Sequence, residues 1–154
     1  MEISSFVFDW LANPHRFSKL TGNLQLPLII LSTTMISLGL YYGLFDSPKD
    51  YQQGDAVRIM YVHVPSAWLA SFLYFSLAVS CIFYLVWKHP LADLIANAIA
   101  PIGLIFSILT LISGSLWGKP MWGTWWVWDA RLTSVAILFI CLLYTSDAAD
   151  DCEG

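Results

Sequence analysis

Charged residues are scarce in this sequence, and long stretches have none. Asp, Glu, Lys and Arg make up 12% of the 154 residues, whereas hydrophobic residues make up 58%. No charged residue occurs in residues 26–45, 64–87 or 94–118. Each run is about as long as the roughly 20 residues that a helix needs to cross a hydrocarbon core of about 30 Å. With a mean hydropathy of +0.66, this composition excludes an ordinary soluble domain and predicts a membrane chain.

Several motifs that would indicate other functions are missing. The chain has no C-x-x-C-H sequence for covalent heme attachment and no C-x-x-C redox pair. It has no Gly-rich phosphate loop, no basic patch with interleaved aromatic residues, and no visible nucleophile–base pair or carboxylate dyad. Nucleotide binding, nucleic-acid binding and an enzyme with its own catalytic residues therefore have no support. Cys81, within the second apolar run, is interpreted as a small hydrophobic residue of the core.

The apolar runs predict an all-α, polytopic membrane helix bundle with three complete spans and the start of a fourth. The fourth run begins at Ala130. Residues 1–25 mix aromatic and charged side chains, which is typical of an interfacial helix, and Asn13-Pro14 would end that helix. The short connection 88–93 predicts that spans two and three are antiparallel neighbours.

Small residues recur along the third span. Gly103, Ser107, Thr110 and Gly114 form a seam that permits another helix to approach closely. We therefore expect this side of the span to pack within the bundle.

Tryptophan is concentrated between the third and fourth apolar runs. Five of the eight tryptophans lie within residues 117–128. Gly118, Pro120 and Gly123 are expected to break a helix there, so the segment is predicted to be largely irregular. An aromatic belt that fixes helix depth would explain one or two tryptophans at a membrane boundary better than it explains this group. The group consists of Trp117, Trp122, Trp125, Trp126 and Trp128.

These indoles can share a surface whichever conformation the segment takes. In a helix, Trp122, Trp125 and Trp126 would lie on one face, and in an extended segment Trp126 and Trp128 would. At least two flat apolar rings can line one surface, which suits a large flat apolar ligand.

His63 lies just before Pro65, a residue favoured in the first turn of a helix. The imidazole is therefore predicted to sit at the N-terminal mouth of the second span. The partial positive charge of a helix N-terminus disfavours imidazolium and leaves a neutral ring that can bind a metal. From position alone, the alternative is an interfacial histidine that only hydrogen-bonds a neighbour, which is the commoner case for a lone histidine.

The number of spans brings His63 and the tryptophans together. With three complete spans, the loops 46–60 and 117–129 must emerge on the same side of the membrane. His63 and the tryptophan group are thus expected to be on one face. Counting Lys and Arg near the span ends does not decide which side of the membrane this is.

The sequence WGTWWVWDARLTS, residues 122–134, resembles the tryptophan-rich WWD motif of the cytochrome c assembly superfamily of heme-handling membrane proteins. Its WDARLT ending resembles the heme exporter protein C family, also called cytochrome c maturation protein C. Similarity to that family extends through residues 50–54, 61–65 and 100–103, and covers most of the chain as far as Ile140.

The resemblance implies a six-span protein that acts as a heme-binding membrane subunit of the cytochrome c maturation system. It would hold heme b transiently and non-covalently at its outer face and pass it to a periplasmic heme chaperone. It would act in the lipid bilayer beside subunits of an ABC-type heme exporter, with no nucleic acid involved. The family also implies a multi-pass protein of the bacterial inner (cytoplasmic) membrane with the Trp-rich loop in the periplasm.

The same resemblance assigns roles to individual residues. His63 matches the family's axial ligand of heme iron, and the family's second axial histidine lies in a later external loop, beyond the residues of this sequence. The other residues expected to bind heme are Trp117, Trp122, Trp125, Trp126, Trp128, Asp129 and Arg131.

Asp129 and Arg131 also have a local interpretation. Asp129 is placed to cap the N-terminus of the fourth helix. Arg131 in the first turn is unfavourable for the helix dipole, so a negative partner is expected. That partner is either Asp129 or a heme propionate, whose carboxylate matches the planar fork of the guanidinium.

The C-terminal sequence CLLYTSDAAD, residues 141–150, resembles one reading frame of a transposon-end adapter used to prepare sequencing libraries. We expect the natural reading frame to end near Ile140 and residues 141–154 to be a non-native tail, which leaves residues 26–140 as the heme-handling membrane domain. The alternative is a genuine solvated acidic C-terminus. The net charge of −4 is due entirely to Asp147, Asp150, Asp151 and Glu153.

Two other functions fit parts of the sequence. A transporter component with an aromatic gate would need ionisable residues within its spans, and the three complete runs have none. A structural anchor subunit would use the tryptophans only to mark depth in the bilayer.

Overall fold

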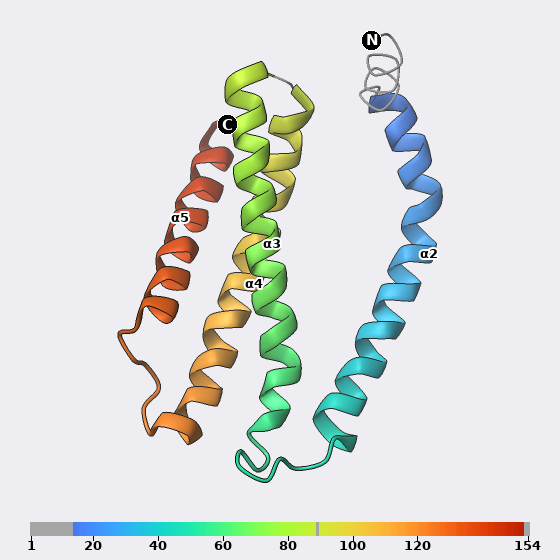
Figure 1. Cartoon of the computed structure of the whole chain (residues 1–154). Helices are drawn as coiled ribbons and strands as arrows, with labels where there is room; N and C mark the ends of the chain where they lie inside the picture. The colour runs from blue at the N-terminus through green and yellow to red at the C-terminus, as the bar shows by residue number, and fades with distance from the viewer. Residues whose placement is uncertain (1–13, 89, 153–154) are drawn as a thin grey trace, which may run out of the picture. The chain divides into compact units, whose positions relative to one another are not determined.

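The computed structural model describes residues 14–88 and 90–152. The described residues are almost entirely helical and contain no β-strand, apart from an isolated bridge between Asp50 and Gly54. The all-α prediction is therefore confirmed. In chain order the helices are α2 (Pro14–Tyr41), the short π-helix η1 (Tyr42–Asp46), α3 (Val57–Trp87), α4 (Pro90–Trp122) and α5 (Ala130–Cys152) (Figure 1).

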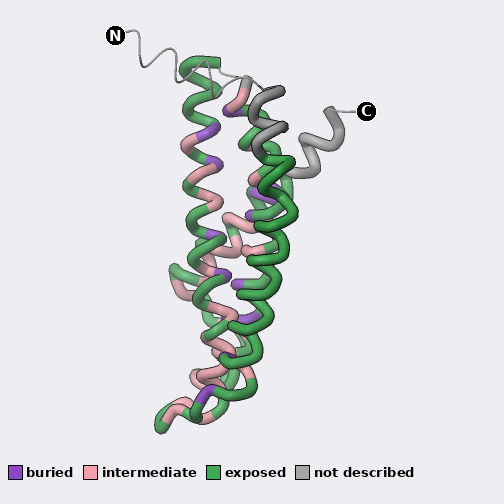
Figure 2. The backbone as a smooth tube through the Cα atoms, turned by 90° about the vertical axis from the view of Figure 1, so that its right-hand side faces the viewer, coloured by how far each residue is buried: buried purple, intermediate pink, exposed green. Residues whose placement is uncertain are grey.

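Three helical segments are long and apolar enough to cross a membrane, namely Thr21–Asp46, Val57–Trp87 and Leu91–Trp122. A shorter apolar segment, Ala130–Thr145, belongs to α5. Exposed positions predominate along the described helices (Figure 2). Many of these positions carry large hydrophobic side chains. Lipid contact makes such exposure favourable, whereas water would not. The chain is a multi-pass membrane protein, as the apolar runs predict.

The chain forms two compact units, residues Met1–Phe45 and Asp46–Gly154. In the first unit, α2 begins at Pro14, where the missing N–H of proline would have no helical partner in any case. The short interfacial helix predicted to end at Asn13-Pro14 would precede α2, and it stays a prediction. Residues 14–25 of the predicted interfacial segment thus belong to the same helix as the first span, and residues 1–13 lie outside the described part of the chain.

In the second unit, α4 packs against both α3 and α5 (Figure 1). The helix α3 ends at Lys88, which takes a left-handed conformation with φ of 50° and donates its backbone N–H to the Tyr84 carbonyl at 2.7 Å. Because α4 begins only two residues later, the two helices run antiparallel side by side. This confirms the predicted neighbours.

The small-residue seam of α4 is buried, as predicted. Gly103 faces both neighbouring helices, because a Cβ added there would lie 3.6 Å from Leu142 of α5 and 3.8 Å from Leu73 of α3. The buried hydroxyl groups are satisfied locally, since Ser107 donates to the Gly103 carbonyl at 2.8 Å. The buried seam consists of Gly103, Ser107, Thr110 and Gly114, together with Ser113.

The end of α4 differs from the sequence-based expectation. Gly118 and Pro120 are predicted to break the helix, but α4 continues through both to Trp122. Proline removes only one backbone donor and its fixed φ is helical, so its cost is limited this close to the helix end. Gly123 is the actual terminator, with φ of +74° and its N–H donated to the Lys119 carbonyl at 3.0 Å. Within the Trp-rich segment 117–134, only residues 123–129 are irregular.

Two further expectations concern cysteine and the tail. Cys81 is exposed on α3 rather than in the core, which lipid contact permits for a small apolar side chain.

The helix α5 continues to Cys152, and Leu142 is only 2% exposed. The non-native origin of residues 141–154 stays a prediction, which sequencing of the genomic locus tests.

Candidate functional site

The polar loop between η1 and α3 is shaped by Asp50. Its Oδ1 accepts the backbone N–H groups of Gln52 and Gln53, each at 2.8 Å. The chain then reverses at Gly54, where φ is 57° and the N–H donates to the Asp50 carbonyl at 2.9 Å. An Asp carboxylate in a turn commonly accepts hydrogen bonds from backbone N–H groups two or three residues later. The positive φ at residue 54 favours glycine. The backbone of Gln53 is thus part of this turn.

Charged residues join this loop to the start of α3. Lys49 pairs with Asp55 at 2.8 Å, and the Arg58 guanidinium donates to the Ser47 carbonyl at 3.1 Å. The hydrogen bond from Lys49 holds the pKa of Asp55 below its ordinary value. Side-chain contacts therefore connect this loop to the start of α3.

Gln53 connects this loop to the end of α4. The indole N–H of Trp117 donates to Gln53 Oε1 at 3.0 Å, across 64 positions of sequence. The two loops predicted to emerge on the same side of the membrane are therefore in contact within one unit. His63 and the first tryptophans lie at that common end, which confirms the expectation that they share one face.

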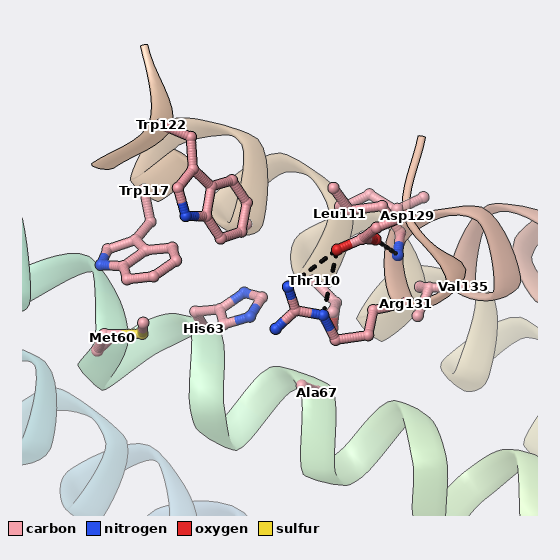
Figure 3. Close-up of a pocket in the computed structure, with 12 residues that line it drawn as sticks. Met60, His63, Ala67, Thr110, Leu111, Trp117, Trp122, Asp129, Arg131 and Val135 are labelled. Carbon is pink, nitrogen blue, oxygen red and sulfur yellow. Dashed lines mark hydrogen bonds and ion pairs between the residues drawn. The ribbon is translucent and has the colours of Figure 1, made fainter. Parts of the chain in front are cut away.

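Beneath these loops lies an open cleft of about 280 Å³. This volume is near the lower end of the roughly 300–1,000 Å³ typical of small-molecule pockets. Figure 3 shows the His63 imidazole between the two indoles on one side and the Arg131 guanidinium on the other. The lining is mostly apolar. Its residues are Met60, His63, Ala67, Thr110, Leu111, Gly114, Trp117, Trp122, Asp129, Arg131, Leu132 and Val135.

His63 is not at the mouth of its helix, contrary to the prediction. Because α3 begins at Val57, His63 lies in its second turn, and Pro65 is inside the helix rather than in its first turn. The charge of a helix N-terminus acts within about the first turn, so it does not control this imidazole. Instead, the ring is half-buried and its Nδ1 lies 3.0 Å from the Ser113 hydroxyl of α4.

Trp117 and Trp122 form one wall of the cleft. Their rings meet edge to face, with centroids 5.2 Å apart and planes at 84°. Gly118 allows this arrangement, because a Cβ added there would lie 3.2 Å from Cε3 of Trp122. Both indoles belong to α4, so the helix fixes where they point.

The other three tryptophans do not line the cleft. Trp126 and Trp128 meet edge to face at 5.7 Å, which matches the expectation for an extended segment. Trp125 lies near the Lys119 ammonium, 5.7 Å from ring centroid to nitrogen, and Trp128 is 83% exposed. The expected group of five is thus divided into a pair inside the cleft and three rings outside it.

Asp129 caps α5, as predicted. Its Oδ1 accepts the N–H of Leu132 at 2.8 Å, and its carbonyl accepts the N–H of Thr133 at 3.1 Å. Its Oδ2 pairs with Arg131 at 2.9 Å. The Leu132 hydrogen bond and then the Arg131 side chain hold the pKa of Asp129 below its ordinary value.

Asp129 is therefore the partner of Arg131 within the chain. The guanidinium also lies over the Trp122 ring, with Cζ 5.7 Å from the centroid. The Arg131 side chain is 79% exposed, so some of its N–H donors face the open cleft.

Several site residues were not predicted as such. Ser113 and Gln53 contact predicted site residues through hydrogen bonds. A serine within an apolar run carries no distinguishing sequence signal, and Gln53 is marked only by its place in residues 50–54, which resemble the family. The sequence predicts Thr110 and Gly114 only as packing residues, and the structure places them beside His63 as well.

The described residues contain no group of three or more His, Cys, Asp or Glu side chains that could hold a metal ion. Protein sites for a bare zinc ion use three or four such ligands. Within the described chain, His63 can thus offer one ligand to a metal whose other ligands come from elsewhere.

Known proteins resemble the chain over most of its length. A family model described as heme exporter protein C matches residues 7–150. The heme exporter protein C of Bradyrhizobium diazoefficiens is 51% identical over 133 residues, which are 86% of this chain and 50% of the relative. The protein of the same name from Haemophilus influenzae is 44% identical over 140 residues, 89% of this chain and 57% of the relative. The one from Escherichia coli is 47% identical over 128 residues, 83% of this chain and 52% of the relative. The chain spans about half the length of these curated relatives.

Proposed function

The chain belongs to the heme exporter protein C family, and we propose that it is a heme-binding membrane subunit of a cytochrome c maturation system. Its role is heme export and delivery rather than chemical catalysis. The observation that carries the proposal is the meeting of His63, Trp117, Trp122 and Arg131 in one cleft. These residues come from three different helices, so only the folded unit assembles them.

The residues of the cleft suit heme. A porphyrin is large, flat and apolar, with an iron that accepts axial ligands and with propionates at one edge. The cleft offers an imidazole, an apolar wall of two indoles and an exposed guanidinium. Its volume of about 280 Å³ is small for such a ligand, so the described residues would enclose one part of it. Because no C-x-x-C-H sequence is present, binding would be non-covalent, as for heme b.

Each residue then has a role that its position supports. His63 would be an axial ligand, and Trp117 and Trp122 would contact the macrocycle. Asp129 would hold Arg131 in place, and Arg131 would bind a propionate with the donors that Asp129 does not occupy. The family's second axial histidine would come from an external loop outside this sequence.

Three tryptophans lie outside the cleft, and we assign them to the outer edge of the same ligand. Trp125, Trp126 and Trp128 belong to the irregular segment beside the cleft. These indoles, of which Trp125 and Trp128 are exposed, would cover the part of the macrocycle that the cleft leaves open. This is the portion that a receiving protein could approach.

The location and partners follow from the same family membership. We propose that the chain lies in a bacterial inner membrane with the cleft facing the periplasm. There it would give heme to a periplasmic heme chaperone, and it would act beside ABC-type heme exporter subunits. The relatives' shared description as heme exporters and the three membrane-length helices support this arrangement.

Heme titration of the purified protein in lipid nanodiscs, followed by Soret absorbance, tests the proposal. His63→Ala should weaken binding by more than about 100-fold, because loss of a ligand should exceed the roughly 10–100-fold effect of losing a ligand's hydrogen-bond partner. In His63→Gly, added imidazole should restore the spectrum. A matched control is Trp68→Phe, since Trp68 is exposed on the same helix away from the cleft.

Binding that is indifferent to His63→Ala would contradict the proposal. If the Trp122→Ala variant were equally indifferent, a structural anchor with tryptophans at the membrane surface would remain as the better account.

A further inference from the structure

We propose that Ser113 and Gly114 of α4 form a socket for the His63 imidazole, which keeps Nδ1 protonated and leaves the lone pair of Nε2 available in the cleft. Ser113 is thus a positioning residue. The inference rests on the proposed function for its purpose, but the state of the ring can be measured without heme.

The hydrogen bonds of Ser113 determine the direction of its contact with His63. Ser113 Oγ lies 2.5 Å from the Leu109 carbonyl oxygen and 3.3 Å from the Thr110 carbonyl oxygen. Both carbonyl oxygens are acceptors only, and a hydroxyl group has a single proton. Two oxygens 2.5 Å apart require that proton between them, because their lone pairs would otherwise repel. The Ser113 proton is therefore directed to Leu109.

The contact between Ser113 and His63 must then use the proton of the imidazole. Nδ1 of His63 lies 3.0 Å from Ser113 Oγ, which is ordinary hydrogen-bond distance. Since the serine proton is engaged elsewhere, Nδ1–H donates to a lone pair of Ser113. A neutral imidazole with its proton on Nδ1 has a lone pair on Nε2, and that nitrogen can bind a metal.

Gly114 provides the space that this arrangement needs. A Cβ added at position 114 would lie 3.0 Å from Cε1 of His63 and 3.5 Å from Nδ1, but 3.9 Å from Nε2. The ring edge that includes Nδ1 thus packs against the backbone of α4, and Nε2 is the nitrogen farther from it. Any larger residue would push the ring away from Ser113. Gly114 therefore serves the imidazole as well as the packing of α3 on α4.

The acceptor in this socket is uncharged. Ligating histidines often donate their second N–H to a carboxylate, which raises the basicity of the ligand. A serine hydroxyl fixes the same tautomer with a smaller effect on basicity. This suits a protein that must release heme after binding it.

The tautomer can be tested directly in the heme-free protein. With ¹⁵N-labelled histidine in lipid nanodiscs, NMR chemical shifts distinguish Nδ1–H from Nε2–H. The chain has three histidines, so the His63 signals are those lost in His63→Ala. We expect the wild-type ring to be protonated at Nδ1, Ser113→Ala to populate both tautomers, and Ser113→Thr to restore the wild-type state.

Ser107→Ala is the matched control, because Ser107 is equally part of the buried seam and its hydroxyl donates to the Gly103 carbonyl of its own helix. It should leave the His63 signals unchanged. A wild-type ring protonated at Nε2, or a Ser113→Ala ring identical to wild type, would overturn the inference.

Heme affinity gives the second measurement. Ser113→Ala should weaken heme binding by about 10-fold, the lower part of the range for a ligand's hydrogen-bond partner. Ser113→Thr should recover most of the affinity, and Ser107→Ala should lose little. Equal losses in Ser113→Ala and Ser107→Ala would indicate general destabilisation and would contradict the socket.

The two proposals fail in different ways. A wild-type protein with Nδ1 protonated that binds no heme would refute the proposed function and leave the socket in place. A protein that binds heme through His63 but shows no dependence on Ser113 would refute the socket and leave the proposed function in place.

Discussion

The two tryptophans on α4 and the three in the irregular segment after it differ in the structure that positions their side chains. Trp117 and Trp122 project from α4, where Gln53 binds one indole and Gly118 makes room for the other. Trp125, Trp126 and Trp128 belong to the irregular residues 123–129. A helix fixes the direction of its side chains more firmly than a short irregular loop does. The sequence presents one cluster of five rings, but only the inner pair is pre-organised to face His63.

Replacing one tryptophan of the α4 pair and one of the irregular segment by alanine should give the largest difference in heme affinity. Trp122→Ala should weaken heme binding by roughly 10-fold, since an aromatic pair contributes ~0.5–1.5 kcal/mol beyond its buried area and about 1.4 kcal/mol is a factor of ten. Trp128→Ala should change affinity by less than about threefold, because its ring is outside the cleft. Soret titration of both variants measures the difference. An equal or greater loss in Trp128→Ala would contradict the division.

Gly118→Ala should separate stability from binding. Alanine is favoured over glycine in a helix by about 1 kcal/mol, so helix stability should not fall. The added Cβ would lie 3.2 Å from Trp122 Cε3, so the indole must shift by a few tenths of an ångström. We expect heme affinity to fall by about threefold while the thermal unfolding followed by circular dichroism is unchanged or improved.

The control for Gly118→Ala is Gly39→Ala, because a Cβ at residue 39 of α2 would meet nothing within 4 Å. It should gain the same helix propensity without loss of affinity. Unchanged binding in both variants would show that the position of Trp122 is not critical.

The hydrogen bond from Trp117 to Gln53 should have a moderate effect. Gln53→Leu leaves the partly buried indole N–H without its acceptor, which costs roughly 1–3 kcal/mol of stability. Thermal unfolding should occur at a lower temperature, and the emission of Trp117 should change. Gln53→Glu retains an acceptor oxygen and should behave like wild type. Identical unfolding of the Leu and Glu variants would mean that the contact contributes nothing.

The smallest effect is expected at Asp129, and it should depend on pH. Its pKa is below the ordinary value because Leu132 and Arg131 stabilise the carboxylate. The resulting stability is fully present above the ordinary carboxyl pKa of about 3.9 and is lost as pH falls through the lowered pKa. At neutral pH, Asp129→Asn keeps an N-cap oxygen, so heme affinity should change by less than about twofold. Thermal unfolding measured between pH 2 and 7 should show that Asp129→Asn lacks the loss of stability that protonation of Asp129 causes in the wild type.

Much of the fold could be predicted from local features. Runs without charge identified the spans, the small residues of α4 marked a buried seam, and Asp129 was identified as a cap. The helix ends were harder to predict, because hydropathy reports the part of a helix that meets lipid. The helix α3 begins at Val57 and carries Arg58 in its first turn, since a helix can continue into polar surroundings with its backbone bonds intact.

The sequence by itself determined that the chain crosses the membrane and that histidine and tryptophan gather at one end of it. Both follow from run length and the number of spans, which need no knowledge of packing. Only the tertiary structure decided which indoles face His63, and that Ser113 and Gly114 of a different helix hold its ring. Those choices depend on how α3 and α4 are rotated and shifted against each other, and 50 positions of sequence separate His63 from Ser113.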